Sequence, residues 1–143
     1  LGVVGTGGIY ATAEDLAVFG GWLAGPGELN EASLKAMAQP EDQKGLWPDE
    51  DAPDALAFGL GWDSVEWFPF HQNGITALVK GGDTQSYRAA LGVLPEHIMP
   101  AAVLSSGGMS PYNEIAASQM LIAALREKGV KAGQMICLDE ILS

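Results

Sequence analysis

The sequence predicts an α+β fold, with an antiparallel sheet of about four strands, a long C-terminal helix packed on it and two shorter N-terminal helices. Alternating apolar residues fill the middle of the chain, which indicates strands. Glycine- and proline-rich turns separate these runs, as in hairpins. Capped segments with apolar residues at helical spacing come before and after them. We find no internal repeat, and treat residues 1–143 as one segment of a single domain.

The first helix is expected to begin after Thr12. This residue is a good N-cap, and Glu14 and Asp15 place negative charge in the first turn, where the helix dipole favours it. Gly25-Pro26-Gly27 ends the helix. Its predicted core-facing stripe consists of Leu16, Phe19 and Leu23, widened by Val18 and Trp22.

A second helix is expected from Asn30 to Gln39, because Pro40 disfavours helical geometry in the residue before it. Residues 40–57 follow as an acidic, proline-rich segment, for which a solvated loop is the prediction. Its acids do not follow the spacing of a calcium-binding EF-hand loop, so no metal site is predicted; they are Asp49, Glu50, Asp51 and Asp54.

The sheet is expected from strands at 58–68, 75–82, 86–94 and 100–105. In the first of these, the apolar residues change parity near Asp63-Ser64, which indicates a bulge or bend. A helix over 111–128 follows, with Ser110 as cap, and should lie on one face of the sheet. The two early helices should lie near one end of the sheet, and residues 130–143 form a tail with little pattern.

Charge and composition exclude several classes of function. The chain has 18 acidic and 7 basic residues, a formal net charge of −11, which repels phosphate backbones and argues against a nucleic-acid partner. No apolar run approaches the roughly 20 residues of a membrane span. The single Cys137 allows neither an internal disulfide nor a cysteine-based zinc site. No cofactor is predicted, and the sequence does not indicate a compartment.

Lys80-Gly81-Gly82 is the candidate for chemistry, because it ends the predicted strand 75–82. A lysine beside two residues with almost no side chain lets an anion or a polarised carbonyl approach the main chain closely. The alternative is a hairpin in which Gly-Gly-Asp-Thr turns the chain and Lys80 lies in solvent. The local pattern by itself favours the hairpin.

Several segments in order carry a resemblance to a known family: GGIYATAEDLAVFGGWL, FGLGW, KGG, SYRAALGVLPE and VLSSGG, followed by a terminal helix. The chain resembles, from about Gly7 to Lys128, the C-terminal part of the serine β-lactamase and penicillin-binding-protein-like family, in its class C and esterase-related branch. The resemblance implies that Lys80-Gly81-Gly82 is the third active-site motif and faces the catalytic cleft. It also implies an oxyanion-hole role for the backbone N–H of Asp83, and substrate contacts for Gly81, Gly82 and Thr84.

The chain departs from the family at the other two motifs. No serine is followed by lysine three residues later, and no tyrosine by asparagine two residues later. Both motifs precede the GGIYAT segment in the family order. We therefore expect a C-terminal piece of a longer protein, whose missing N-terminal part is its partner in the domain and whose substrate is a small molecule or peptide. Alone, the piece should be inactive.

Two further interpretations depend on the resemblance. Gly81 stands where family members carry a threonine that holds a substrate carboxylate, which favours an esterase- or peptidase-like parent over a dedicated β-lactamase; Thr84 could partly replace that contact. His71 and His97 lie in predicted turns and do not indicate a Ser/His/Asp site. The alternative function is a non-catalytic module that binds peptide or cell-wall fragments.

An incomplete domain would also leave a strand edge and an apolar face without their usual partners. Open edges and large apolar patches favour association with another chain. We therefore expect the isolated piece to form a homo-oligomer.

Overall fold

The computed structural model describes residues 7–26, 29–41, 57–107 and 113–132. The predicted cap Ser110, the acids of residues 49–54 and Cys137 lie outside these residues. The three strands form one antiparallel sheet in the order β1 (Leu78–Asp83), β2 (Tyr87–Leu94), β3 (Met99–Ser106). The α+β class with an antiparallel sheet and a C-terminal helix is confirmed.

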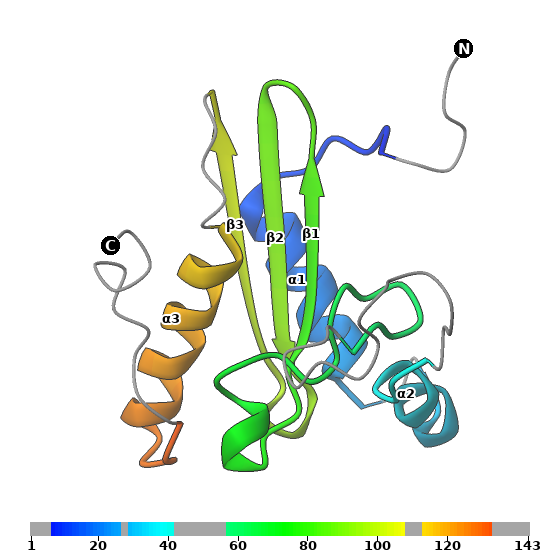
Figure 1. The fold of residues 1–143 in the computed structure, drawn as a ribbon, viewed down its shortest axis with the longest axis vertical. Helices are drawn as coiled ribbons and strands as arrows, with labels where there is room; N and C mark the ends of the chain where they lie inside the picture. Colours follow the sequence, from blue (N-terminus) through cyan, green and yellow to red (C-terminus); the bar gives the residue numbers. More distant parts are fainter. Residues whose placement is uncertain (1–6, 27–28, 42–56, 108–112, 133–143) are drawn as a thin grey trace, which may run out of the picture.

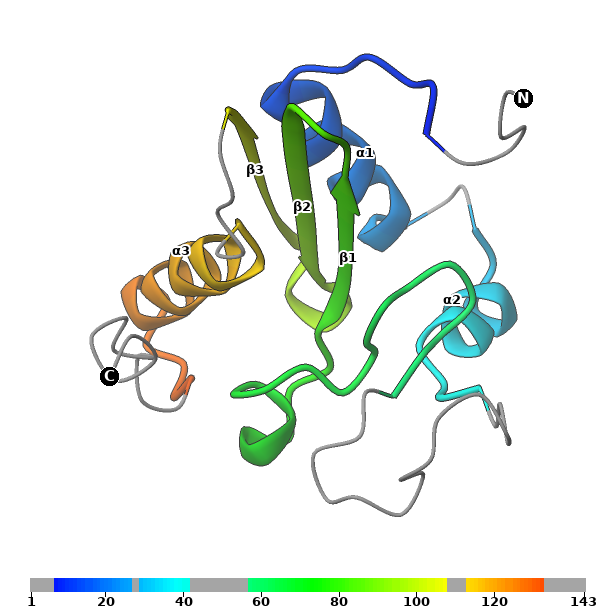
Figure 2. The same ribbon diagram turned by 45° about the horizontal axis from the view of Figure 1, so that its top comes forward.

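Helices cover both faces of this sheet, as the two views in Figures 1 and 2 show. Helix α1 (Ala13–Ala24) packs on β2 and β3 from one side, and α3 (Asn113–Glu127) packs on the same strands from the other. Helix α2 (Glu31–Met37) lies beside the lower end of the sheet in Figure 1. Two short 3-10 turns, η1 (His71–Asn73) and η2 (Pro95–His97), complete the described elements.

The predicted strand over 58–68 is wrong. This segment makes isolated bridges instead, such as Gly59 with Trp62 and Ser64 with Val79. Gly61 has a φ of 79°, so the chain reverses there before a ladder can extend. At the expected bend, the N–H groups of Asp63 and Ser64 both donate to the carbonyl of Val79, at 2.9 and 3.2 Å. Two consecutive residues thus face the single residue Val79, which disrupts the regular strand pairing as a β-bulge does.

The early helices were expected at one end of the sheet, and for α1 this is wrong. Gly20 explains why α1 can lie across the face: a Cβ at this position would be 2.9 Å from Pro100 Cβ and 3.0 Å from Leu91 Cδ1. Gly92 plays the same part for α3, since a Cβ there would lie 3.0 Å from Leu121 Cδ1. Absent side chains thus let both helices approach the sheet closely.

The predicted stripe of α1 is correct for Leu23 but wrong for Val18, Phe19 and Trp22, and Leu16 is only partly buried. Val18, Phe19 and Trp22 are 67%, 49% and 45% exposed, and the last two rings stack with centroids 6.0 Å apart. The buried residues of α1 are Gly20, Leu23 and Ala24. Close approach to the sheet selects this face, because small residues reduce the distance between helix and sheet while bulky ones increase it.

Asp15 gives the start of α1 a testable pH dependence. The backbone N–H of Thr12 donates to the Asp15 carboxylate at 2.8 Å, and the Thr12 hydroxyl donates to it at 2.8 Å. Both hydrogen bonds hold the pKa of Asp15 below its ordinary value, and the bond from the backbone N–H has the larger effect. A carboxyl whose pKa is lower in the folded state stabilises the fold above its unfolded pKa, and this contribution is lost as the pH falls through the folded pKa.

We therefore expect the Asp15 carboxyl carbon to titrate at a lower pH than an ordinary aspartate in an NMR experiment, because the pKa of Asp15 is lowered. The Thr12 amide signal should move with the same midpoint, because that amide is the donor. In Asp15→Asn the pH-dependent movement of the Thr12 amide should disappear. A midpoint at or above the ordinary aspartate value would contradict the cap geometry.

Candidate active-site edge on strand β1

Lys80 lies where β1 loses its second neighbour. Before it, Val79 pairs with Ser64; from Lys80 to Asp83 the described residues place a strand, β2, on one side of β1 only. We call this open side of residues 80–83 the Lys80–Asp83 edge. The Lys80 side chain is 49% exposed there.

Two backbone N–H groups of this edge point away from β2. Thr84 N donates to Tyr87 O at 2.8 Å, so residues 84 and 87 form a hydrogen-bonded pair of the hairpin. Hydrogen-bonded and non-bonded pairs alternate along an antiparallel ladder. The pairs Asp83–Arg88 and Gly81–Ala90 are therefore non-bonded ones, with their N–H groups directed outward. Gly81 N indeed donates in that direction, to Asp63.

Asp63 organises the start of the edge. One of its carboxylate oxygens accepts from Lys80 Nζ at 2.7 Å, and the other accepts from Gly81 N at 2.7 Å. Lys80 Nζ also donates to the Gly81 carbonyl at 2.8 Å. A single carboxylate thus fixes both the ammonium and the adjacent main chain. Sequence reasoning missed this residue, although the parity change at Asp63-Ser64 did locate the bend that turns it toward β1.

Glu114, in the first turn of α3, is the second carboxylate at this edge. Its side chain occupies the space that a Cβ at position 81 would need, and Asp63 Oδ2 lies 3.5 Å from the same point. The buried Ser118 hydroxyl donates to the Glu114 carbonyl and accepts from Trp67 Nε1, both at 2.8 Å. This chain of hydrogen bonds ties the first turn of α3 to the segment before β1.

The remaining predicted site residues lie along and beyond the edge. A Cβ at Gly82 would meet no atom within 4 Å, so space is open beside it. The Asp83 carboxylate pairs with Arg88 at 2.9 Å. The Thr84 hydroxyl accepts from the N–H of Tyr87 at 2.9 Å and so closes the hairpin turn. Lys80 to Asp83 are therefore together at the edge, and Thr84 is in the turn that follows.

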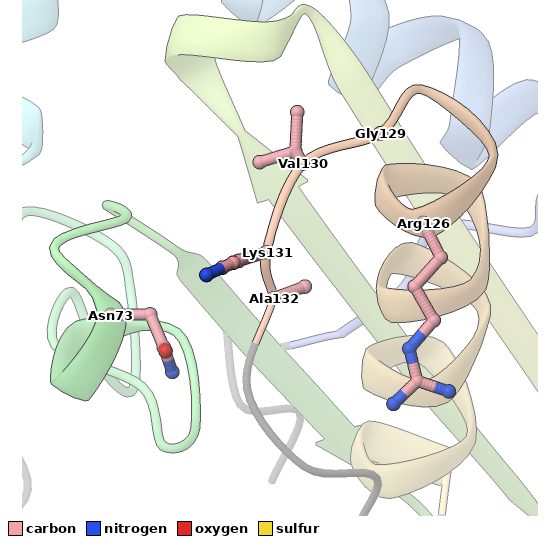
Figure 3. A pocket seen from close by; sticks show the side chains of 6 residues that line it. All are labelled: Asn73, Arg126, Gly129, Val130, Lys131 and Ala132. Carbon is pink, nitrogen blue, oxygen red and sulfur yellow. The ribbon is translucent and has the colours of Figure 1, made fainter.

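The two histidines lie elsewhere, His71 in η1 and His97 in η2. A pocket of about 470 Å³ opens at the end of α3 opposite to Glu114, where Lys131 extends toward Asn73 (Figure 3). Its lining consists of Asn73, Arg126, Gly129, Val130, Lys131 and Ala132. It is not part of the Lys80–Asp83 edge.

Within the described ranges, no three His, Cys, Asp or Glu side chains gather in a way that could hold a metal ion. None of the helices described is long and apolar enough to cross a membrane.

Comparison with known proteins places the chain in a family. The family model described as Beta-lactamase matches residues 2–125. No curated protein and no solved structure matches the sequence. The family match covers the sheet, α1, α2 and most of α3, including the whole Lys80–Asp83 edge. The chain therefore belongs to the beta-lactamase family.

Proposed function

We propose that this chain forms one side of the active site of a serine hydrolase, with the Lys80–Asp83 edge facing the substrate. The observation that carries the proposal is the edge itself: a half-exposed lysine begins an open strand, and the N–H of Asp83 points outward from it. In acyl transfer, a serine oxygen attacks a carbonyl carbon and negative charge develops on the carbonyl oxygen. An outward N–H and a nearby cation both stabilise such charge.

Each residue of the edge then has a proposed role. Asp83 N–H donates to the oxyanion, and Lys80 supplies positive charge at the site. Gly82 lets the substrate backbone lie close to the strand, because a Cβ there would meet no atom within 4 Å. A substrate contact for Gly81 is less well supported, since Glu114 fills the space beside it and its N–H already donates to Asp63. A substrate contact for Thr84 is less well supported, since its hydroxyl already accepts from Tyr87 N–H. The substrate class we propose is an ester or a peptide, because Gly81 offers no hydroxyl to a substrate carboxylate.

The nucleophile is proposed to come from another segment of the same protein. None of the serines in the 143 residues is followed by lysine three positions later, and the second family motif, Tyr-x-Asn, is absent as well. In the complete reaction, the serine would form an ester bond to the acyl group while the alcohol or amine leaves with a proton. Water would then hydrolyse the acyl-serine and restore the hydroxyl.

Active-site labelling tests this proposal. The 143-residue chain should take up no label from a fluorescent penicillin or a fluorophosphonate, and should not hydrolyse a p-nitrophenyl ester above the buffer rate. The longer protein encoded by the same gene should be labelled on a serine outside these residues. The matched control is the longer protein with that serine changed to alanine.

Two results would count against the hydrolase. Labelling of a serine within the 143 residues would contradict the assignment of the nucleophile to another segment. A folded longer protein that stays unlabelled but binds peptide or cell-wall fragments would instead support the alternative, a non-catalytic binding module.

A further inference from the structure

We propose that the Lys80–Asp83 edge selects ligands that carry an ammonium group over ligands that carry a carboxylate, and that Glu114 is the residue that sets this preference. The inference rests on the proposed function, because it concerns the group that a substrate presents to the same edge. It names a charge preference that neither the family match nor the lysine of the motif would suggest.

The charges at the edge do not balance. Lys80 Nζ lies 2.7 Å from the Asp63 carboxylate, and Arg88 Nη1 lies 2.9 Å from the Asp83 carboxylate. Both cations are therefore already paired with an acid. Glu114 is a third carboxylate, and no cation pairs with it among the described residues. Lys44 is the only cation of the sequence outside the described residues.

The unpaired carboxylate lies against β1 at the start of the Lys80–Asp83 edge. It fills the position of a side chain at residue 81, directly against the strand whose main chain a substrate would follow. Asp63 Oδ2 borders the same point. A ligand carboxylate placed here would meet two acidic side chains, and it would compete with one of them, Asp63, for Lys80. A ligand ammonium would gain a partner in Glu114.

The rest of the molecule acts in the same direction. A formal net charge of −11 lowers the electrostatic potential around the protein, which attracts cations and repels anions over several ångströms. Added salt screens this long-range part, whereas contact between an ammonium and the half-buried Glu114 is screened less. A preference that falls but persists at 0.5 M NaCl would therefore indicate a local contact.

Three small probes of similar size test the charge preference directly. They are N-acetylethylenediamine, which carries an ammonium, N-acetylglycinamide, which is uncharged, and N-acetylglycine, which carries a carboxylate. Each is titrated into the 15N-labelled 143-residue chain, and the amide signals of Gly81, Gly82, Asp83 and Glu114 are followed. We expect the ammonium probe to bind most tightly, the amide probe next and the carboxylate probe least. The ammonium probe should exceed the carboxylate probe by about fivefold, the size expected for one partly exposed ion pair.

Two matched variants separate the contact from the overall charge. Glu114→Gln should bring the two affinities close to equal, while Glu127→Gln, at the other end of α3, removes the same charge and should keep the preference. Asp63→Asn should raise the affinity of the carboxylate probe, because it releases Lys80 from its partner. Equal or tighter binding of the carboxylate probe to the wild-type chain, or no response of the edge amides to any probe, would overturn the inference.

These results are independent of serine labelling. A labelled longer protein with a carboxylate-preferring edge would keep the hydrolase proposal and refute the charge preference. An unlabelled longer protein whose edge binds the ammonium probe most tightly would refute the hydrolase proposal and keep the charge preference.

Discussion

Fluorophosphonate labelling of the proposed longer protein is expected to slow about 100-fold when Lys80 is replaced by Met, the size of loss seen when one electrostatic contact to a developing oxyanion is removed. Methionine keeps an unbranched stem of similar length but removes the ammonium. The fold should be little affected, because Lys80 is 49% and Asp63 42% exposed, and a solvent-exposed ion pair contributes little stability. The measurement is the second-order rate constant of fluorophosphonate labelling, under conditions in which the wild-type and variant proteins are both folded.

Lys35→Met is the matched control, since Lys35 is an exposed lysine on α2. It removes the same charge from the protein and should leave the labelling rate unchanged. A Lys80→Met protein that folds and is labelled at the wild-type rate would remove Lys80 from the proposed active site. Loss of labelling in both variants would mean that the net charge of the protein, and not the position of Lys80, controls the labelling rate.

Replacing Gly20 by Ala should destabilise the fold, although alanine is the better helix former. Helix propensity alone would stabilise α1 by about 1 kcal/mol. A Cβ at Gly20, however, would lie 2.9 Å from Pro100 Cβ, 3.0 Å from Leu91 Cδ1 and 3.1 Å from Val93 Cγ2. Overpacking of this kind costs about 1–3 kcal/mol, and α1 would have to move off the sheet to relieve it. We expect a net loss of about 1 kcal/mol in the free energy of unfolding.

The neighbouring glycine provides the control in the same helix. A Cβ at Gly21 would be 3.7 Å from Pro100 Cγ, an ordinary contact, so Gly21→Ala should stabilise the fold by up to about 1 kcal/mol. Urea denaturation followed by tryptophan fluorescence would compare the two variants. If Gly20→Ala were as stable as Gly21→Ala, α1 would not be held against the sheet by close approach at Gly20.

Local signals in the sequence were enough for the hairpin strands and the terminal helix. Apolar residues recur at every second position from Tyr87 to Val93, a proline turn follows, and β2 is found at 87–94. Alternation did not suffice for 58–68, where a reversal at Gly61 and the double contact of Asp63 and Ser64 with Val79 break the ladder. Parity predicts which side chains share a face, but not whether a neighbouring strand pairs with them.

The sequence by itself determined that a strand and a hairpin meet near Lys80-Gly81-Gly82, because these features depend on neighbouring residues alone. The local pattern was wrong to place Gly-Gly-Asp-Thr in the turn, since residues 81–83 continue β1 and the turn is formed by residues 84–87. The sequence also determined the Thr12 and Asp15 cap of α1, again from neighbouring residues alone. Tertiary structure decided which carboxylates meet Lys80 and Gly81. Asp63 is 17 residues from Lys80 and arrives through the bend before β1, and Glu114 arrives because Gly92 lets α3 lie close to the sheet. Contacts between distant segments depend on how closely helices and strands can pack, which no local pattern records.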